Sequence, residues 1–155
     1  MYPIVKWLHL MALVVWLGEV VCFSFVVAPS IFRTFEVGEA GRAVGAIFPL
    51  YYRIGYVCGA VLLVTSMLFL ATGTSRLGWS TSSGLAAVML VATLYAGVVI
   101  QPRAAALRPQ LHAATAAPGT KEEFDRLHRL AVTLNGAVLI CGLVVSVISA
   151  TRLQP

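Results

Sequence analysis

Charged residues are scarce in this sequence. Asp, Glu, Lys and Arg make up only 11% of the 155 residues, whereas a soluble domain carries about a quarter. Hydrophobic residues account for 59%, and the mean hydropathy is +0.90. A soluble domain needs more charged residues than this to cover its water-exposed surface. Most of the protein surface must therefore face lipid.

Cysteine and the known catalytic motifs are also scarce. Cys22, Cys58 and Cys141 each lie within an apolar run, where a thiol behaves as a small hydrophobic group, and we expect no disulfide. The sequence has no nucleophile beside a base, no phosphate-binding loop and no cluster with metal-ligand spacing. We therefore expect a protein that is not an enzyme. We expect no nucleic-acid partner either, because the net charge of +5 lies mostly beside the membrane.

Four long apolar runs dominate the chain, at about residues 4–28, 50–71, 84–100 and 130–150. Each can cross a bilayer as a helix, and none alternates like a barrel strand. The predicted fold is therefore all-α, a bundle of four transmembrane helices forming one domain over residues 1–155. Pro29 and Pro102 should end the first and third helices, because proline cannot donate to the helical ladder. The first run is too long for a signal peptide, so we expect it to be retained.

The two longer connections should lie on one side of the membrane. Residues 30–49 mix aromatic and charged side chains, which is typical of a short amphipathic helix at the interface. Residues 101–129 should form a cap, with the fourth helix beginning at Thr120 and Glu123 closing a capping box. Eight basic residues lie near the span ends on this side, and three lie on the other. The eight are Arg33, Arg42, Arg53, Arg103, Arg108, Lys121, Arg126 and Arg129, and the three are Lys6, Arg76 and Arg152. Both termini should therefore face outward, toward the periplasm if the protein lies in a bacterial cytoplasmic (inner) membrane.

Two layers of polar residues lie within the spans, where a polar side chain is energetically costly unless it is paired. The outer layer is centred on His9, with Met67 and Met89 at the same depth. Imidazole and thioether could together hold haem b or Cu(I). Alternatively, His9 forms a hydrogen bond with Ser66 or Ser146, and the methionines fill space.

The inner layer is richer, and it comprises Glu19, Tyr52, Tyr56, Tyr95, Arg103, His128 and Asn135. One interpretation is a hydrogen-bond network that fixes helix packing. The other is a cavity open to the inside, in which Glu19 carries a proton or holds a cation. Lipid headgroups are the expected partners of Arg42, Arg53, Arg103 and Arg108. Gly55 and Gly59 form a GxxxG step, which permits close helix approach.

Several sequence blocks resemble one known family over nearly the whole chain. The blocks are Trp7–His9, Trp16–Gly18, Ser24–Pro29, Gly41–Gly45, Phe48–Tyr52, Gln101–Arg103, Phe124–Leu130 and Asn135. They resemble the transmembrane-protein-205-like family of small four-span proteins. That resemblance implies a four-helix membrane bundle whose polar signature is His9, Arg42, Arg103, His128 and Asn135. Glu19 departs from it, because a small residue commonly follows Trp-Leu-Gly. The first helix alone is similar to haem-containing protoporphyrinogen oxidases and to the copper-resistance transport domain.

Three functional hypotheses follow from the sequence. We favour a non-enzymatic membrane protein, either an accessory subunit of a larger membrane complex or a protein that handles a small molecule or metal. A haem- or copper-binding redox protein using His9 is the second. A small proton-coupled transporter or resistance protein using Glu19 is the third, ranked lower because transporters usually have more helices and internal repeats. The expected partners are membrane lipids. Further candidate partners are other membrane subunits and a second copy of the chain.

Overall fold

Helices make up almost all of the chain in the computed structural model, which describes residues 3–72, 75–111 and 118–153. No residue in these ranges forms a strand. The helices join into four rods that are long and apolar enough to cross a membrane: Pro3–Thr34, Val37–Ala71, Arg76–Leu111 and Thr120–Arg152. The predicted all-α, four-span fold is thus confirmed, and the chain is an integral membrane protein.

Two of the rods contain a short π-helical segment. The first rod consists of α1 (Pro3–Cys22), the π-helix η1 (Phe23–Val27) and α2 (Ala28–Thr34), and the second is α3 (Val37–Ala71). The third consists of α4 (Arg76–Tyr95), the π-helix η2 (Ala96–Ile100) and α5 (Gln101–Leu111), and the fourth is α6 (Thr120–Arg152).

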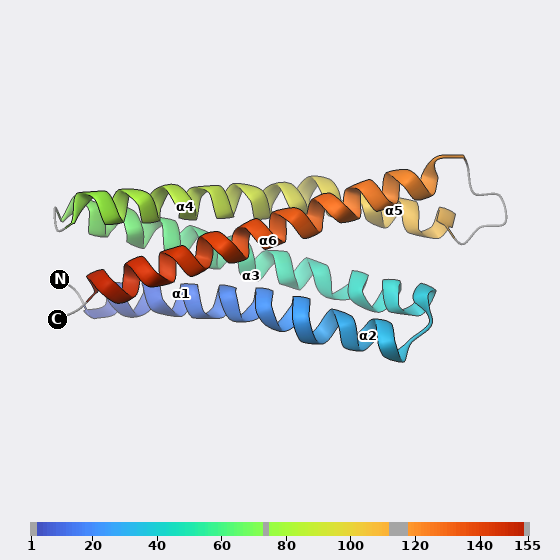
Figure 1. Cartoon of the computed structure of the whole chain (residues 1–155), viewed down its shortest axis with the longest axis horizontal. Coiled ribbons are helices and arrows are strands. Elements are labelled where there is room, and N and C mark those ends of the chain that lie inside the picture. Colours follow the sequence, from blue (N-terminus) through green and yellow to red (C-terminus); the bar gives the residue numbers. More distant parts are fainter. Residues whose placement is uncertain (1–2, 73–74, 112–117, 154–155) are drawn as a thin grey trace.

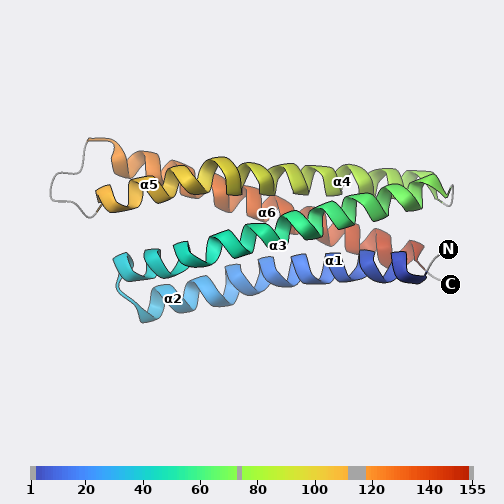
Figure 2. The ribbon, with the colours of Figure 1, turned by 180° about the vertical axis from the view of Figure 1, so that it is seen from behind.

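The four rods pack in an up-down-up-down ring, each against its neighbours (Figure 1). α3 lies between α1 and α4, and α6 closes the ring between α4 and α1. Both termini lie at one end of the bundle, which we call the terminal end, and α2 and α5 lie at the other, the α2/α5 end. At the terminal end Lys6 Nζ donates a hydrogen bond to the carbonyl oxygen of Leu153 at 3.2 Å. Figure 2 shows the same arrangement from behind.

The prolines do not end the helices, so that prediction was wrong. The first rod continues through Pro29 to Thr34, and the third continues through Pro102 to Leu111. A π-helical turn lies just before each proline: the Ala28 N–H bonds to the Phe23 carbonyl, and the Gln101 N–H to the Ala96 carbonyl. This wider turn shifts the backbone that the proline ring would otherwise strike, so the helix bulges instead of breaking.

The connections also differ from the prediction. Residues 30–49 do not form a separate amphipathic helix, because they are the end of α2 and the first turns of α3, joined at Phe35 and Glu36. The fourth helix does begin at Thr120, but its cap is Gly119, with φ of 90°, and not the predicted Thr120 capping box. Glycine suits that backbone conformation because it has no Cβ. The part of the predicted cap at residues 112–117 lies outside the described residues.

The core is built around Trp16, which is only 2% exposed. A Cβ added at Gly59 would lie 2.9 Å from the Trp16 ring and 2.9 Å from the Leu90 methyl group. Gly55 is similarly close to Trp16 and Thr93. The GxxxG step predicted on α3 therefore makes room for Trp16 from α1 on one side and for α4 on the other.

The outer surface is apolar along the rods. Large exposed side chains include Val14 on α1, Val64 on α3, Val91 on α4 and Val147 on α6, each between 56% and 65% exposed. Lipid is the solvent that such a surface requires, so contact between these helices and lipid follows directly.

Candidate functional site

A cavity of about 380 Å³ lies inside the bundle, toward the α2/α5 end. All four rods contribute to its wall: Trp16, Phe23, Ser24 and Phe32 from the first rod, Phe48 and Tyr51 from α3, Thr93 and Ala96 from the third rod, and His128, Val132 and Asn135 from α6. Trp16 and Phe32 are 16 residues apart, so the cavity extends roughly 24 Å along the first rod. Its size falls within the usual range for a small-molecule site.

The cavity opens sideways, between α2 and α6. These two helices are fully described, and no Cα atom of α2 lies within 8 Å of a Cα atom of α6, although Cα atoms of α1 and α6 do approach that closely. Figure 1 shows the reason, since α6 and the first rod diverge toward the α2/α5 end. Phe32 on α2 and Val132 on α6 are 49% and 57% exposed and mark the two rims.

Three polar side chains form a connected network in the cavity wall. The Tyr51 hydroxyl donates a hydrogen bond to Asn135 Oδ1 at 2.5 Å, and Asn135 Nδ2 donates one to Ser24 Oγ at 2.9 Å. The network joins η1, α3 and α6, and all three residues line the cavity. It supplies hydrogen-bonding groups within an otherwise apolar chamber, which is how small-molecule sites orient their ligands.

Aromatic rings form much of the rest of the wall. The Phe23 ring lies 5.0 Å from Tyr51 and 5.5 Å from Phe48, measured between ring centroids. Tyr52 continues the group, 5.3 Å from Tyr51. All four rings belong to the lining. Such a wall offers flat, polarisable surfaces to a bound ring.

His9 lies elsewhere, near the terminal end, and is completely buried. Its Nδ1 is 2.8 Å from Thr65 Oγ1, and its Nε2 is 2.9 Å from Ser149 Oγ. A neutral imidazole donates through one nitrogen and accepts through the other, so both nitrogens are engaged. Phe69 and Trp79 enclose the ring edge-on, at 5.3 Å and 5.6 Å between centroids. The sequence had suggested Ser66 or Ser146 as the partner, but the structure pairs His9 with Thr65 and Ser149.

The structure does not gather the other residues of the outer layer around His9. Met67 is two residues beyond Thr65, about 200° around α3, and is 57% exposed on the outer surface. Met89 is buried and packs near Gly142 and Leu17. Ser66 pairs with Ser82 at 3.0 Å. Among the described residues, no group of three or more His, Cys, Asp or Glu side chains could hold a metal ion.

The residues of the predicted inner layer lie in several places. Asn135 belongs to the cavity network, and His128 lies exposed at the cavity rim, stacked on Phe124. Tyr52 and Tyr56 stack on each other at 6.4 Å and pack against Gly97 of η2. Tyr95 and Arg103 are exposed.

Glu19 is not part of the cavity wall. It is half-buried on α1. Within the described structure its Oε2 is buried without a hydrogen-bond partner. In the described part of the chain Glu19 makes no ion pair with Arg103 or His128, with which the sequence had grouped it.

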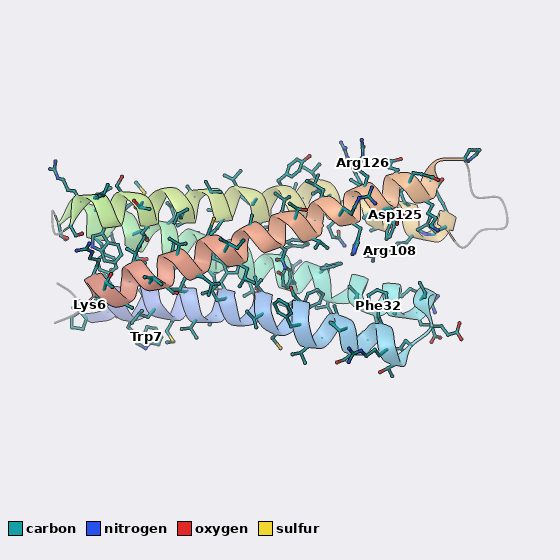
Figure 3. The ribbon with its side chains drawn as sticks, in the orientation of Figure 1. Lys6, Trp7, Phe32, Arg108, Asp125 and Arg126 are labelled. Atoms are coloured by element: carbon teal, nitrogen blue, oxygen red, sulfur yellow. The ribbon has the colours of Figure 1, made fainter. Side chains whose placement is uncertain are left out.

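The four arginines expected at lipid headgroups differ in their surroundings. Arg42 and Arg53 are exposed, as is Arg103, and Arg42 pairs with Glu39 at 3.9 Å. Arg108 is half-buried, with its guanidinium 5.9 Å from the centre of the Phe48 ring and against Gly45. Figure 3 shows it pointing from α5 toward α3, close to the divergence of the rods. Arg108 thus packs between α5 and α3, beside the Phe48 ring of the cavity wall.

Sequence reasoning missed Ser24 and Tyr51, although both are central to the cavity network. Ser24 is 111 residues from Asn135, its hydrogen-bond partner, and Tyr51 is 84 residues from it. Tyr51 also stands beside Tyr52, which the sequence had singled out instead. The helical phase of α3, now visible through the buried Gly55 and Cys58, is the signal that could have selected Tyr51.

Comparisons with known proteins give a family but no activity. The family described as a domain of unknown function (DUF4149) matches residues 11–113. An uncharacterized protein of Aquifex aeolicus (strain VF5) is 32% identical over 121 residues, which cover 78% of each chain. No solved structure gives a significant match. The matched segment contains the parts of the cavity wall that come from the first, second and third rods.

Proposed function

This chain belongs to the DUF4149 family, a domain of unknown function, and from that premise we propose that it binds a small apolar molecule taken from the membrane. The observation that carries the proposal is the cavity between α2 and α6. The molecule enters sideways from the lipid, and the Ser24, Asn135 and Tyr51 network orients it. The chain is then a handling protein for a membrane-borne compound.

The dimensions of the cavity favour a small molecule over a helix of a partner subunit. An α-helix with its side chains is about 10–12 Å across, whereas a cavity of about 380 Å³ has the size of a small-molecule site. The polar network also lies within the chamber and not along its rim, so it is placed for a ligand that enters fully. An accessory-subunit role would use the outer faces of the rods instead.

We also propose that the protein lies in a bacterial cytoplasmic membrane, which the relative from Aquifex aeolicus supports. The excess of basic residues near α2 and α5 supports termini that face outward. The sequence blocks described above support membership of the transmembrane-protein-205-like group.

Blocking the cavity tests the proposed function. Native mass spectrometry of the protein, extracted from its own membrane in mild detergent, should show a small-molecule adduct on the wild type. The Val132→Trp variant places an indole at the rim and should lose that adduct. Val147→Trp is the matched control, because Val147 is equally exposed on α6 but outside the cavity. An adduct retained by both variants, or absent from the wild type after such extraction, would contradict the proposal.

A further inference from the structure

Resting on the proposed function, we propose that the bound molecule is a prenylated quinone, with its carbonyl oxygen on the cavity network and its ring against the aromatic wall. The class is defined by its chemistry: a flat, neutral ring with carbonyl acceptors, attached to an apolar tail. Four properties of the cavity lead to it, namely a surplus of donors, the absence of charged side chains from the described lining, the depth of the network along the bundle and the aromatic rings of the wall.

The network has more hydrogens than it uses. The Tyr51 hydroxyl and the Ser24 hydroxyl each supply one hydrogen, and the Asn135 amide supplies two. The two bonds within the network use two of these four hydrogens. Two donors therefore remain, whichever way the Asn135 amide is turned. A ligand that satisfies them must offer an acceptor oxygen.

Ser24 does not lose its hydrogen to its own helix. Thr93, Thr133 and Ser149 each donate to the carbonyl four residues earlier, at 2.8 to 2.9 Å. In the described structure Ser24, which lies in η1, makes no such bond and acts only as the acceptor from Asn135. The π-helical turn thus leaves a free hydroxyl hydrogen beside the cavity, where a carbonyl oxygen can accept it.

Among the residues that the structure describes, the cavity lining includes no Lys, Arg, Asp or Glu side chain. His128 is its one basic residue, and it lies exposed at the rim. An anionic headgroup drawn inside would find no charged partner in the lining itself, and burial without one is strongly unfavourable. Arg108 lies beside the wall, 5.9 Å from the centre of the Phe48 ring, but is not a lining residue. A neutral acceptor such as a ring carbonyl carries no such cost.

The depth of the network separates a quinone from a phospholipid. Asn135 lies seven residues beyond His128 along α6, about 10 Å farther from the α2/α5 end of the bundle. The ester carbonyls of a phospholipid stay beside its headgroup at the interface. A ring carbonyl can reach this depth because the whole head group is apolar enough to enter. The rings of Phe23, Phe48 and Tyr51 then pack against it.

Titration followed by native mass spectrometry tests the assignment. The detergent-solubilised full chain is titrated with a short-chain prenylated benzoquinone, a short-chain prenylated naphthoquinone and a ring-free prenyl hydrocarbon of the same length. Both quinones should bind more tightly than the hydrocarbon, and the tighter of the two identifies the natural source. Ser24→Ala should weaken quinone binding about fivefold, the value of one neutral hydrogen bond, while leaving the affinity for the hydrocarbon unchanged.

Thr133→Ala is the matched control, because Thr133 is exposed on α6 and bonds only to its own helix. Asn135→Ala provides a second test of the network should Ser24→Ala fail to fold. If the hydrocarbon binds as tightly as the quinones and neither network variant changes the affinities, the quinone assignment is wrong but the proposed function stands. If no probe binds and Val132→Trp changes nothing, both are wrong.

Discussion

At the scale of single residues, several polar side chains in the interior of the bundle are paired with a side chain of another rod. His9 of α1 is joined to Thr65 of α3 and Ser149 of α6, and Ser66 of α3 is joined to Ser82 of α4. Each pair removes an unsatisfied polar group from an apolar interior, where it would cost a few kcal/mol. These contacts therefore specify which helix faces meet.

Replacing His9 should lower stability markedly. His9→Ala removes two interhelical hydrogen bonds and leaves a cavity between Phe69 and Trp79, so the loss should be about 3 kcal/mol. Thermal unfolding in detergent measures it as a lowered midpoint temperature. His128→Ala is the matched control, since His128 is exposed and should contribute less than about 0.5 kcal/mol. Equal midpoints for the two variants would show that His9 is not a structural residue.

The sequence identified polar residues within the spans more readily than their partners. His9 and Asn135 stood out because they are strongly polar and lie in apolar runs. Their partners are separated from them by 56 to 140 residues. Depth along a helix could be estimated from the residue number, but the rotation of one helix against another could not. The choice of Thr65 over Ser66, and of Tyr51 over Tyr52, depends on that rotation.

At the scale of elements, the π-helical segments shape the site. η1 and η2 each precede a proline, and each also contributes to the cavity wall, through Ser24 and Ala96. The sequence predicted that the helices end at these prolines. A helix that stops at a proline and a helix that bulges around it both lack the same backbone N–H, so the sequence alone does not distinguish them. Tertiary packing decides between them, since α2 and α5 continue along α3 and α6.

Close contact at the glycine step of α3 gives a second stability prediction. Gly59→Ala brings a methyl group to 2.9 Å from the Trp16 ring, which is only 2% exposed, and to 2.9 Å from a Leu90 methyl group, so the variant should be destabilised by about 1–3 kcal/mol. Gly84→Ala on α4 is the control, because nothing lies within 4 Å of its added Cβ. It should be neutral or stabilising by up to about 1 kcal/mol. Thermal unfolding of both variants in the same detergent checks this, and a Gly59→Ala protein as stable as Gly84→Ala would rule out the tight packing.

At the scale of the whole molecule, the protein is a four-span bundle whose rods pack together at the terminal end and diverge between α2 and α6 at the other end. Hydropathy was enough to predict four helices, and the short turns imply that neighbours in the ring run antiparallel. The lateral opening could not be predicted, because it depends on α1 packing against α6 while α2 diverges from it. Nothing in the apolar surface of α2 or α6 marks that difference in the sequence.

A density map of the full chain in lipid nanodiscs would show directly whether the cavity holds a molecule from the membrane. The protein is prepared from its own membrane without added ligand. We predict that α2 and α6 stay apart and that discrete density fills the cavity, in contact with Ser24 and Asn135. A map in which α2 packs directly on α6, or in which the cavity is present but empty, would contradict it.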